Sequence, residues 1–373
     1  MGPEILYLRG EAVEEVRGGA DLVSATILRI LKEHFGADAV EEFYVDRIES
    51  QQGHLVSLGR ALTGRYPAYS RRVSEALAKR CTEGIKFLFV DQSVYGLACA
   101  DAKRAAPGIK CAVLFHNIER SFYLRRAIRA FKPHNVLLLP AITKAERVAV
   151  READLLITLS DRDAKEMHAV YGRRPELVLP PGLEDKNVAQ ANPKPITLIG
   201  TRFKEDITML FVGSAFPPNV QGIRWFARKV LPKIPGKLLV AGRGFESYRT
   251  EFQNDRLTVL GSVADLGPLY AQADLVVSPI FWGSGIKMKT AEAFMYGMPF
   301  VGTTEALEGY DAEAAGALRA DNAEGFIEGI SILTNPAIRE LRAGQSRSYY
   351  LRELSYSAAE RQISDLLMGI MDT

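Results

Sequence analysis

The chain has 373 residues, 47% hydrophobic and 25% charged, a balance that excludes a disordered chain and, at roughly 150 residues per domain, suggests two domains. No apolar run approaches the ~18 residues of a membrane-spanning helix, the N-terminus has no signal-peptide pattern, and three widely spaced cysteines exclude a disulfide framework, so we expect a cytoplasmic protein. The net charge of +2 hides an uneven distribution, because residues 1–56 carry −6, residues 57–147 carry +11 and residues 148–373 carry −3.

The first half of the chain alternates short apolar runs with helical patterns. Runs rich in β-forming residues predict buried strands at 5–8, 87–90, 112–115 and 155–159. This alternation is typical of a parallel α/β sheet. The proline-rich stretch 180–202 has neither a helical nor a strand period, which indicates a linker. We therefore expect a first domain over residues 1–195.

A second series of apolar runs repeats the same alternation. It predicts strands at 209–213, 237–241, 257–260, 274–278 and 299–302, and hence a second α/β domain over residues 196–350. A last helical pattern predicts a C-terminal helix within residues 351–373. Open parallel sheets bind ligands at the carboxyl ends of their strands, so we expect functional residues in the loops that follow the strands.

Three loops of the first domain carry candidate residues. Gly18-Gly19 precedes a helical pattern, which suits either a ligand-binding loop or a tight turn. Asp91 follows the strand at 87–90 and is either a polar group of the site or a helix cap. His116 follows the strand at 112–115, where an imidazole can hydrogen-bond a ligand or share in proton transfer.

An amphipathic basic stretch comes after His116. Arg125, Arg126 and Arg129 alternate with aromatic and aliphatic residues at helical spacing. Such a helix is either simply solvated or lies against an anionic membrane surface. We do not expect nucleic acid as a partner, because the block lacks base-stacking aromatic residues on a recognisable module.

The pattern Asp161-Arg162-Asp163 follows the strand at 155–159. Asp-x-Asp binds a divalent metal in some enzymes, but here it stands at a predicted helix start. Ser160 or Asp161 would cap that helix, and Asp163 would favour its dipole. We therefore predict no metal site.

The strongest pattern is a glycine-rich loop between a strand and a helix of the second domain. Residues 283–285 are Gly-Ser-Gly, and Lys287 and Lys289 fall in the predicted first helical turn. Backbone N–H groups and a helix N-terminus favour a bound phosphate there. Without an anion, each lysine costs about 0.3–1 kcal/mol against the helix dipole. Glu292 shares a helix face with Lys289, so a surface helix with an ion pair is the alternative.

This segment resembles the donor-binding signature of the retaining GT-B glycosyltransferases of family four, also described as glycosyl transferases group 1. The resemblance is dense from about residue 209 to 310 and extends over most of the chain. It rests on the run Gly283-Ser284-Gly285-Ile286-Lys287-Met288-Lys289, followed by Glu292-Ala293 and Gly297-Met298-Pro299. It implies the GT-B fold, with two Rossmann-like domains facing a cleft and a C-terminal helix that crosses back to the first domain.

The resemblance implies a role for Glu292 in particular. In these enzymes the second Glu of a Glu-x7-Glu motif binds the nucleotide ribose, and Glu292 stands at that position. The first Glu contacts the donor sugar, but Ser284 stands there in this chain. We interpret this departure as the variant branch with Gly-Ser-Gly-Ile-Lys-x-Lys.

Other donor contacts follow from the same resemblance. The backbone of Gly283, Gly285 and Ile286 would meet the diphosphate, with Lys287 or Lys289 balancing its charge. Arg243 and the backbone of Val263 would flank the base. Across the cleft, the Gly18-Gly19 loop would approach the donor phosphates, and His116 would touch the donor sugar. His116 and Glu292 are thus the predicted catalytic residues.

The implied activity is transfer of a sugar, with retention of configuration, from a nucleotide-sugar such as a UDP- or GDP-sugar. The acceptor would be a glycan or a lipid-linked molecule in bacterial surface polysaccharide or glycoconjugate synthesis, and the protein would be cytoplasmic or peripheral at the inner membrane face. Neither a cofactor nor a metal is implied, because lysines, loop amides and a helix N-terminus can stabilise the leaving diphosphate.

Two alternatives share this architecture. One is a nucleotide-sugar 2-epimerase, which would need several acid or base residues around the sugar. The other is a non-catalytic nucleotide-sugar-binding protein, which Ser284 suggests. A dehydrogenase is disfavoured, because no Gly-x-Gly-x-x-Gly follows the first strand.

Overall fold

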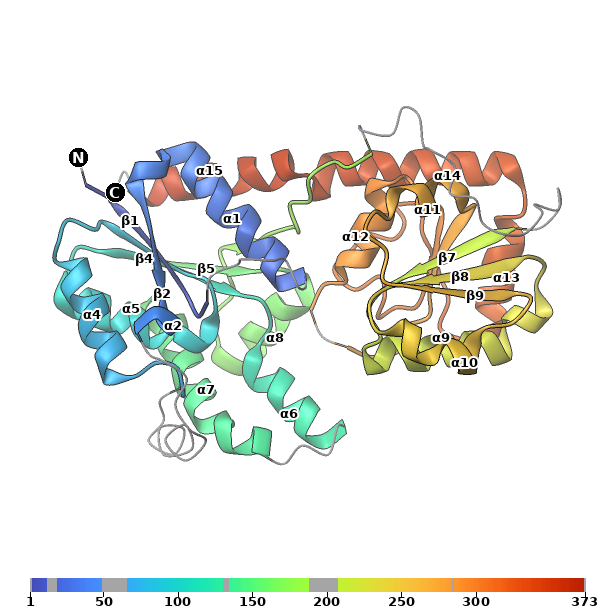
Figure 1. The fold of residues 1–373 in the computed structure, drawn as a ribbon. Helices are drawn as coiled ribbons and strands as arrows, with labels where there is room; N and C mark the ends of the chain where they lie inside the picture. The colour runs from blue at the N-terminus through green and yellow to red at the C-terminus, as the bar shows by residue number, and fades with distance from the viewer. Residues whose placement is uncertain are drawn as a thin grey trace. The chain divides into compact units, whose positions relative to one another are not determined.

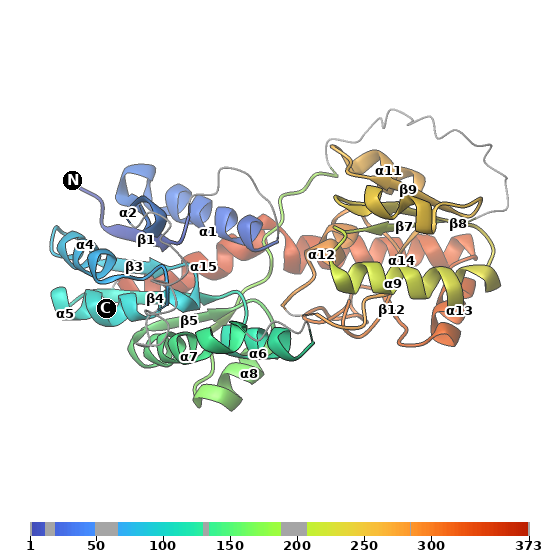
Figure 2. The ribbon, with the colours of Figure 1, turned by 60° about the horizontal axis from the view of Figure 1, so that its bottom comes forward.

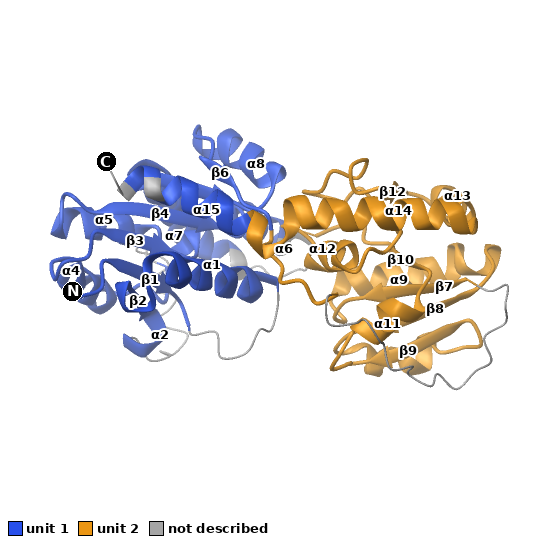
Figure 3. Cartoon of the chain, turned by 90° about the horizontal axis from the view of Figure 1, so that it is seen from above, with its two compact units in different colours: residues 1–180, 359–373 blue, residues 181–358 orange. Residues whose placement is uncertain are grey.

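The computed structural model describes residues 2–11, 19–48, 66–129, 134–187, 207–283 and 285–371. The chain divides into two compact units, residues 1–180 with 359–373 and residues 181–358 (Figure 3). Each unit has a six-stranded parallel sheet with helices on both of its faces (Figures 1 and 2). The predicted fold class, two Rossmann-like α/β domains, is confirmed.

The first unit has the strand order β2-β1-β3-β4-β5-β6. Its strands are β1 (Ile5–Arg9), β2 (Val40–Tyr44), β3 (Phe87–Val90), β4 (Lys110–Phe115), β5 (Leu155–Thr158) and β6 (Leu177–Val178). Its helices are α1 (Gly19–Phe35), α2 (Val45–Ile48), α4 (Arg71–Cys81), α5 (Leu97–Ala105), α6 (Glu119–Arg129), α7 (His134–Glu152) and α8 (Asp161–Tyr171). Every residue of β1, β3 and β5 is buried, as expected for strands covered on both faces.

The second unit has the strand order β12-β11-β10-β7-β8-β9. Its strands are β7 (Thr208–Val212), β8 (Lys237–Ala241), β9 (Leu257–Gly261), β10 (Leu275–Ser278), β11 (Phe300–Gly302) and β12 (Leu318–Arg319). Its helices are α9 (Pro217–Lys229), α10 (Arg249–Phe252), α11 (Gly267–Gln272), α12 (Met288–Met295), α13 (Ala323–Ile332) and α14 (Pro336–Tyr349), which a π-helix (Tyr350–Leu354) extends. The last helix, α15 (Tyr356–Met371), begins in this unit.

The chain passes between the units twice. The first passage lies at residue 180/181, before the expected boundary at 195, which itself falls outside the described residues. Leu183 belongs to the second unit and makes two backbone hydrogen bonds there. Its N–H donates to the Leu354 carbonyl over 2.9 Å, and its carbonyl accepts a hydrogen bond from the Tyr356 N–H over 2.9 Å. The second passage lies within α15, whose residues from 359 onward group with the first unit.

Gly222 marks a close approach that positions the loop after β10. It lies inside α9, and a Cβ built there would come within 1.9 Å of the Pro279 carbonyl oxygen. A Cβ built at Gly344, inside α14, would have no neighbouring atom within 4 Å.

We predict opposite stability changes at these two glycines. Gly222→Ala forces α9 away from the loop and lowers the free energy of unfolding by about 1–3 kcal/mol, as overpacking does. Gly344→Ala is the matched control and raises it by about 0.5–1 kcal/mol through backbone entropy. Urea unfolding midpoints measure both changes, and a Gly222→Ala variant as stable as the wild type would contradict the close contact.

Candidate functional site

The glycine-rich loop lies at the carboxyl edge of the second sheet, between β10 and α12. Gly285 adopts a positive φ of 59°, a backbone conformation that suits glycine. Helix α12 begins at Met288, so Lys287 occupies its N-cap position with extended backbone and not the predicted first turn. Lys289 does lie in that first turn. Ser284 lies outside the described residues.

Lys287 is held within the loop by a buried ion pair. Its Nζ lies 2.6 Å from Glu305 Oε1, in the loop after β11, and 2.8 Å from the Gly285 carbonyl oxygen. The two side chains are only 10% and 18% exposed. A Cβ at Gly283 would come within 3.1 Å of Glu305 Oε1, so glycine leaves room for the pair. Glu305 therefore balances the charge of Lys287 and fixes the loop.

Lys289 has no such carboxylate partner among the contacts of its ammonium group that the structure describes. Its Nζ donates to Asn219 Oδ1 over 2.7 Å and lies 5.3 Å from the centre of the Phe211 ring. Burial, together with the nearby charge of Lys287, lowers the pKa of Lys289 to about 7. A Cβ at Gly213 would come within 3.0 Å of Nζ, which again explains a glycine. The loops after β7 and β10 thus meet at a poorly compensated cation.

Glu292 lies one turn further along α12. Its Oε2 accepts a hydrogen bond from the Tyr270 hydroxyl over 3.3 Å, and the Tyr270 ring stacks on Tyr296 at 4.3 Å. Burial raises the pKa of Glu292, while the positive charge of Lys186 and the hydrogen bond from Tyr270 act in the opposite direction. The carboxylate is therefore oriented from α11 and has acceptor capacity left for a ligand.

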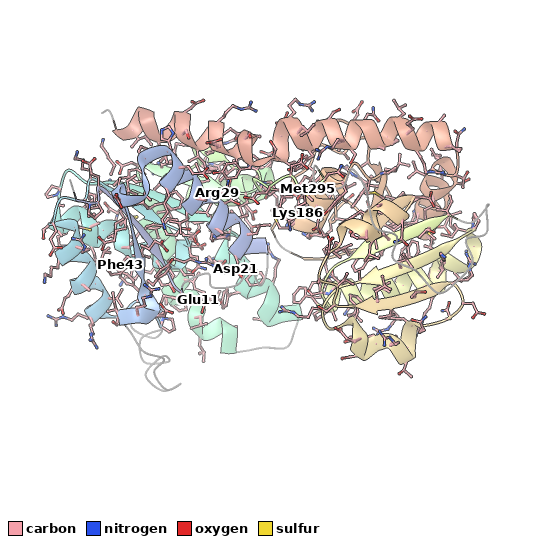
Figure 4. The ribbon with its side chains drawn as sticks, turned by 45° about the horizontal axis from the view of Figure 1, so that its top comes forward. Glu11, Asp21, Arg29, Phe43, Lys186 and Met295 are labelled. Atoms are coloured by element: carbon pink, nitrogen blue, oxygen red, sulfur yellow. The ribbon has the colours of Figure 1, made fainter. Side chains whose placement is uncertain are left out.

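The segment 183–187 runs against α12 and α14 and was not predicted to bear on the site. The Lys186 N–H donates to Met295 Sδ over 3.5 Å, and Figure 4 shows these two residues side by side. Asp185 forms a two-point contact with Arg347, one N–O distance being 3.0 Å. Met295 lies three residues beyond Glu292, so this segment brings the charge of Lys186 to the face of α12 that carries Glu292.

Arg243 and Val263 lie in the loops after β8 and β9. The Arg243 side chain is exposed. The backbone carbonyl of Arg243 accepts a hydrogen bond from the Ala215 N–H over 2.8 Å. Val263 is half-buried. Gly242 has a φ of 145°, and a Cβ there would come within 1.9 Å of the Gly213 carbonyl oxygen. The loops after β7 and β8 are therefore in direct contact, and Arg243 lies beside the loop after β7.

The first unit gathers polar side chains at the carboxyl edge of its own sheet. His116 Nε2 lies 3.0 Å from Asp91 Oδ1, and Asp91 Oδ2 lies 3.4 Å from Arg9 Nε. Arg9 also contacts Asp21 of α1 over 2.6 Å; Asp21 is labelled in Figure 4. His116, Asp91 and Arg9 are 8%, 0% and 3% exposed. Asp91 thus contacts His116 directly and caps no helix in the part of the chain that the structure describes.

The other predicted residues of the first unit are only partly described. Gly19 begins α1, and Gly18 lies outside the described residues. Arg125 on α6 pairs with Glu166 on α8 at 3.0 Å. Arg126 and Arg129 lie on the same helix, but their side chains are not described.

The Asp-x-Asp pattern serves as a helix start. Ser160 is the N-cap of α8 and accepts from the Asp163 N–H over 3.2 Å, and its hydroxyl donates to Asp163 Oδ2 over 2.6 Å. Throughout the described ranges, no cluster of three or more His, Cys, Asp or Glu side chains is arranged to hold a metal ion. Within the same ranges, no helix combines the length and apolar character needed to span a membrane.

Arg9, Asn219, Glu305 and Lys186 were missed as site residues. For Arg9, the available signal was its place as the last residue of a buried strand, where a charge needs a partner. For Glu305, it was its place in the loop that follows the strand predicted at 299–302. Sequence spacing could not show the contacts of Asn219 and Lys186, since their partners lie 70 and 109 residues away.

Comparison with known proteins finds one family model that matches part of the chain. Residues 206–335 match the family model described as "Glycosyl transferases group 1". No curated protein sequence matches the chain. Among solved structures, HepE from Anabaena in complex with UDP is similar at a TM-score of 0.65, with 15% identity over 98% of this chain and 100% of that chain.

Two further structures match over nearly their full length. WaaG, a glycosyltransferase involved in lipopolysaccharide biosynthesis, has a TM-score of 0.65, with 17% identity over 98% of this chain and 100% of that chain. The lipopolysaccharide outer core galactosyltransferase WaaB also has a TM-score of 0.65, with 13% identity over 98% and 99%. The chain therefore has the GT-B fold, and its second unit matches the glycosyl transferases group 1 family.

Proposed function

We propose that this protein is a retaining glycosyltransferase that moves a sugar from a nucleotide-sugar to a glycan or lipid-linked acceptor in bacterial surface polysaccharide or glycoconjugate synthesis. The observation that carries the proposal is the grouping of Lys287, Lys289 and Glu292 around the start of α12, inside the matched region. The solved complexes of HepE with UDP and with UDP-glucose support a nucleotide-sugar as donor.

In this proposal the second unit stabilises the leaving nucleoside diphosphate. The N-terminus of α12 and the backbone amides of the glycine-rich loop favour negative charge there. Lys289, held by Asn219, supplies a cation that contacts no carboxylate among the described residues, while Lys287 stays paired with Glu305 and keeps the loop in shape. Glu292 would accept hydrogen bonds from the ribose hydroxyls. Stabilising charge on the leaving group is the main demand of the transfer step.

His116 would act from the first unit, near the transferred sugar. Its ring is already oriented by Asp91, as a group that exchanges hydrogen bonds with a hydroxyl requires. The transfer proposed here uses no metal, because the chain's own cations and amides balance the diphosphate.

A donor screen tests the proposal. Thermal shifts with UDP-, GDP- and TDP-sugars, each with and without EDTA, should identify one base, with the same shift in both conditions. Release of the free nucleotide and a new glycoside on an added acceptor should follow. An isomerised nucleotide-sugar would point instead to a 2-epimerase, and binding without any turnover would point to a non-catalytic binding protein. Strict dependence on Mn²⁺ would count against the mechanism.

The hairpin of α6 and α7 is the part of the first unit that we propose to contact an anionic membrane. Leu124 is 38% exposed, and Val136 and Leu137 are 47% and 44% exposed. They lie within the block 57–147, whose net charge is +11, so exposed apolar residues occur in the most basic part of the chain. Flotation with phosphatidylglycerol-containing vesicles tests the contact, and no binding at low salt would reject it.

A further inference from the structure

The strongest buried polar cluster of the first unit is the one formed by Arg9, Asp91 and His116. They come from three neighbouring strands: Arg9 ends β1, Asp91 follows β3 and His116 follows β4. The order β1-β3-β4 and the parallel registers, with Leu8 opposite Val90, bring these three strand ends together. The fold therefore assembles the cluster from residues that are far apart in the sequence.

Asp91 determines which nitrogen of His116 carries the proton. A carboxylate accepts hydrogen bonds and donates none, so the 3.0 Å contact between Asp91 Oδ1 and His116 Nε2 requires a proton on Nε2. In the neutral ring, Nδ1 then has a free lone pair. Arg9 Nε lies 3.4 Å from the other oxygen of Asp91 and balances its charge in a site where Asp91 is fully buried.

Four buried atoms of this cluster make no hydrogen bond within the described part of the chain: Arg9 Nε, Arg9 Nη1, Asp91 Oδ2 and His116 Nδ1. Arg9 Nε and Asp91 Oδ2 still face each other as an ion pair at 3.4 Å, whereas no such ion pair accounts for His116 Nδ1 or Arg9 Nη1. Buried polar atoms are almost always hydrogen-bonded, so an unsatisfied acceptor and an unsatisfied donor on one cluster indicate a missing ligand group. Because Asp91 and Asp21 already flank Arg9, a further anion is disfavoured there. A neutral hydroxyl group, which can donate to the Nδ1 lone pair, fits this chemistry.

We propose that Asp91, supported by Arg9, is a positioning residue that keeps the proton of His116 on Nε2 and so presents Nδ1 as the acceptor for a substrate hydroxyl. This inference rests on the proposed function and names how one of its predicted catalytic residues is prepared. Asp91 and Arg9 both act through His116: Asp91 binds Nε2 and Arg9 balances the charge of Asp91.

The tautomer of His116 can be measured directly. The chain has five histidines, so ¹⁵N-imidazole NMR of the histidine-labelled protein, above the pH range where imidazole titrates, gives few signals, and His116→Asn assigns the relevant one. The wild type should show the proton on Nε2. A wild type with its proton on Nδ1 would overturn the proposal without any further variant.

The Asp91→Asn variant tests whether Asp91 sets the tautomer of His116. The amide can turn its NH₂ group toward Nε2, so the proton should move to Nδ1, and kcat should fall about 100-fold while the KM for the donor changes little. Asp163→Asn is the matched control, because Asp163 is equally buried at the same sheet edge but binds Ser160. The control should leave tautomer and kcat unchanged. An Asp91→Asn protein that keeps the wild-type tautomer and kcat would refute the role.

The outcomes also separate this inference from the proposed function. A wild type that neither binds nor turns over a nucleotide-sugar, but shows the Nε2–H tautomer, would reject the transferase and support the positioning of His116. A wild type that transfers sugar with its proton on Nδ1 would support the transferase and reject the positioning role.

Discussion

Replacing Glu292 by alanine should weaken binding of the cognate nucleoside diphosphate about 100-fold and reduce turnover at least as much. The Glu292 carboxylate is oriented by the Tyr270 hydroxyl at 3.3 Å and faces the charge of Lys186. Hydrogen bonds to a charged group contribute about 1.5–3 kcal/mol each, so loss of the ribose contacts accounts for a change of this size. Calorimetric titration with UDP, GDP and dTDP measures it.

A control variant must show that the loss of affinity in Glu292→Ala does not come from damage to a helix or to the fold. Glu328→Ala changes an exposed glutamate on α13 of the same unit and should leave nucleotide affinity unchanged. Glu292→Gln keeps the shape but not the charge and should recover only part of the affinity. Wild-type affinity in a folded Glu292→Ala variant would remove Glu292 from the donor site and with it the strongest link between α12 and the ribose.

The same surroundings predict how Glu292 responds to pH. Burial raises the pKa of its carboxyl group, so the charge is lost at a higher pH than for an exposed glutamate. Nucleotide affinity should therefore begin to fall, on acidification, earlier than an ordinary glutamate would allow. The same titration repeated across the acidic range checks this, and a Glu292→Gln variant should lack that part of the pH dependence.

The sequence predicted local features well and long-range pairings poorly. The runs at 87–90 and 237–241 are strands with the expected bounds, because strands buried on both faces are mainly apolar. Strand β2 was missed because it lies at the sheet edge and carries two half-buried glutamates, Glu41 and Glu42. The two-residue strands β6 and β12 are too short for any period.

The candidate site likewise combines residues that are close together in the sequence with partners that are far away in it. The glycine-rich loop, Lys289 and Glu292 lie within one strand–loop–helix segment, so spacing alone could group them. The partners that set their charge come from elsewhere: Glu305 from the loop after β11 and Asn219 from α9. Sequence spacing carries no information about such contacts, which depend on strand order and on how closely neighbouring loops approach.

Lys289 makes the binding of a diphosphate depend on pH around neutrality. In the free protein its pKa is lowered to about 7 by burial and by Lys287, so its ammonium is charged below that pH and largely neutral above it. A bound diphosphate favours the charged form and raises the pKa again. The Lys289 contribution to affinity should thus be constant below pH 7, where only the Glu292 effect remains, and should decline as the pH rises through and beyond 7, because binding there requires uptake of a proton.

Two substitutions isolate this charge. Lys289→Arg keeps a cation that stays protonated at all these pH values, so its affinity for the cognate nucleoside diphosphate should not decline above pH 7. Lys289→Met removes the cation and should bind about 10- to 100-fold more weakly below pH 7, with little dependence on pH near neutrality. Lys287 remains paired with Glu305 in both variants, so its contribution to nucleotide affinity should be the same in each.

Calorimetry in buffers of different ionisation enthalpy measures the coupled proton. Above pH 7 the wild type should take up close to one proton per diphosphate bound, and both variants close to none. Wild-type binding that is flat across neutrality would contradict the coupling, and proton uptake that persists in Lys289→Arg would assign it to another group. Proton uptake lost in both variants would identify Lys289 as the cation that Asn219 of α9 and Phe211 of β7 hold in place until the anion binds.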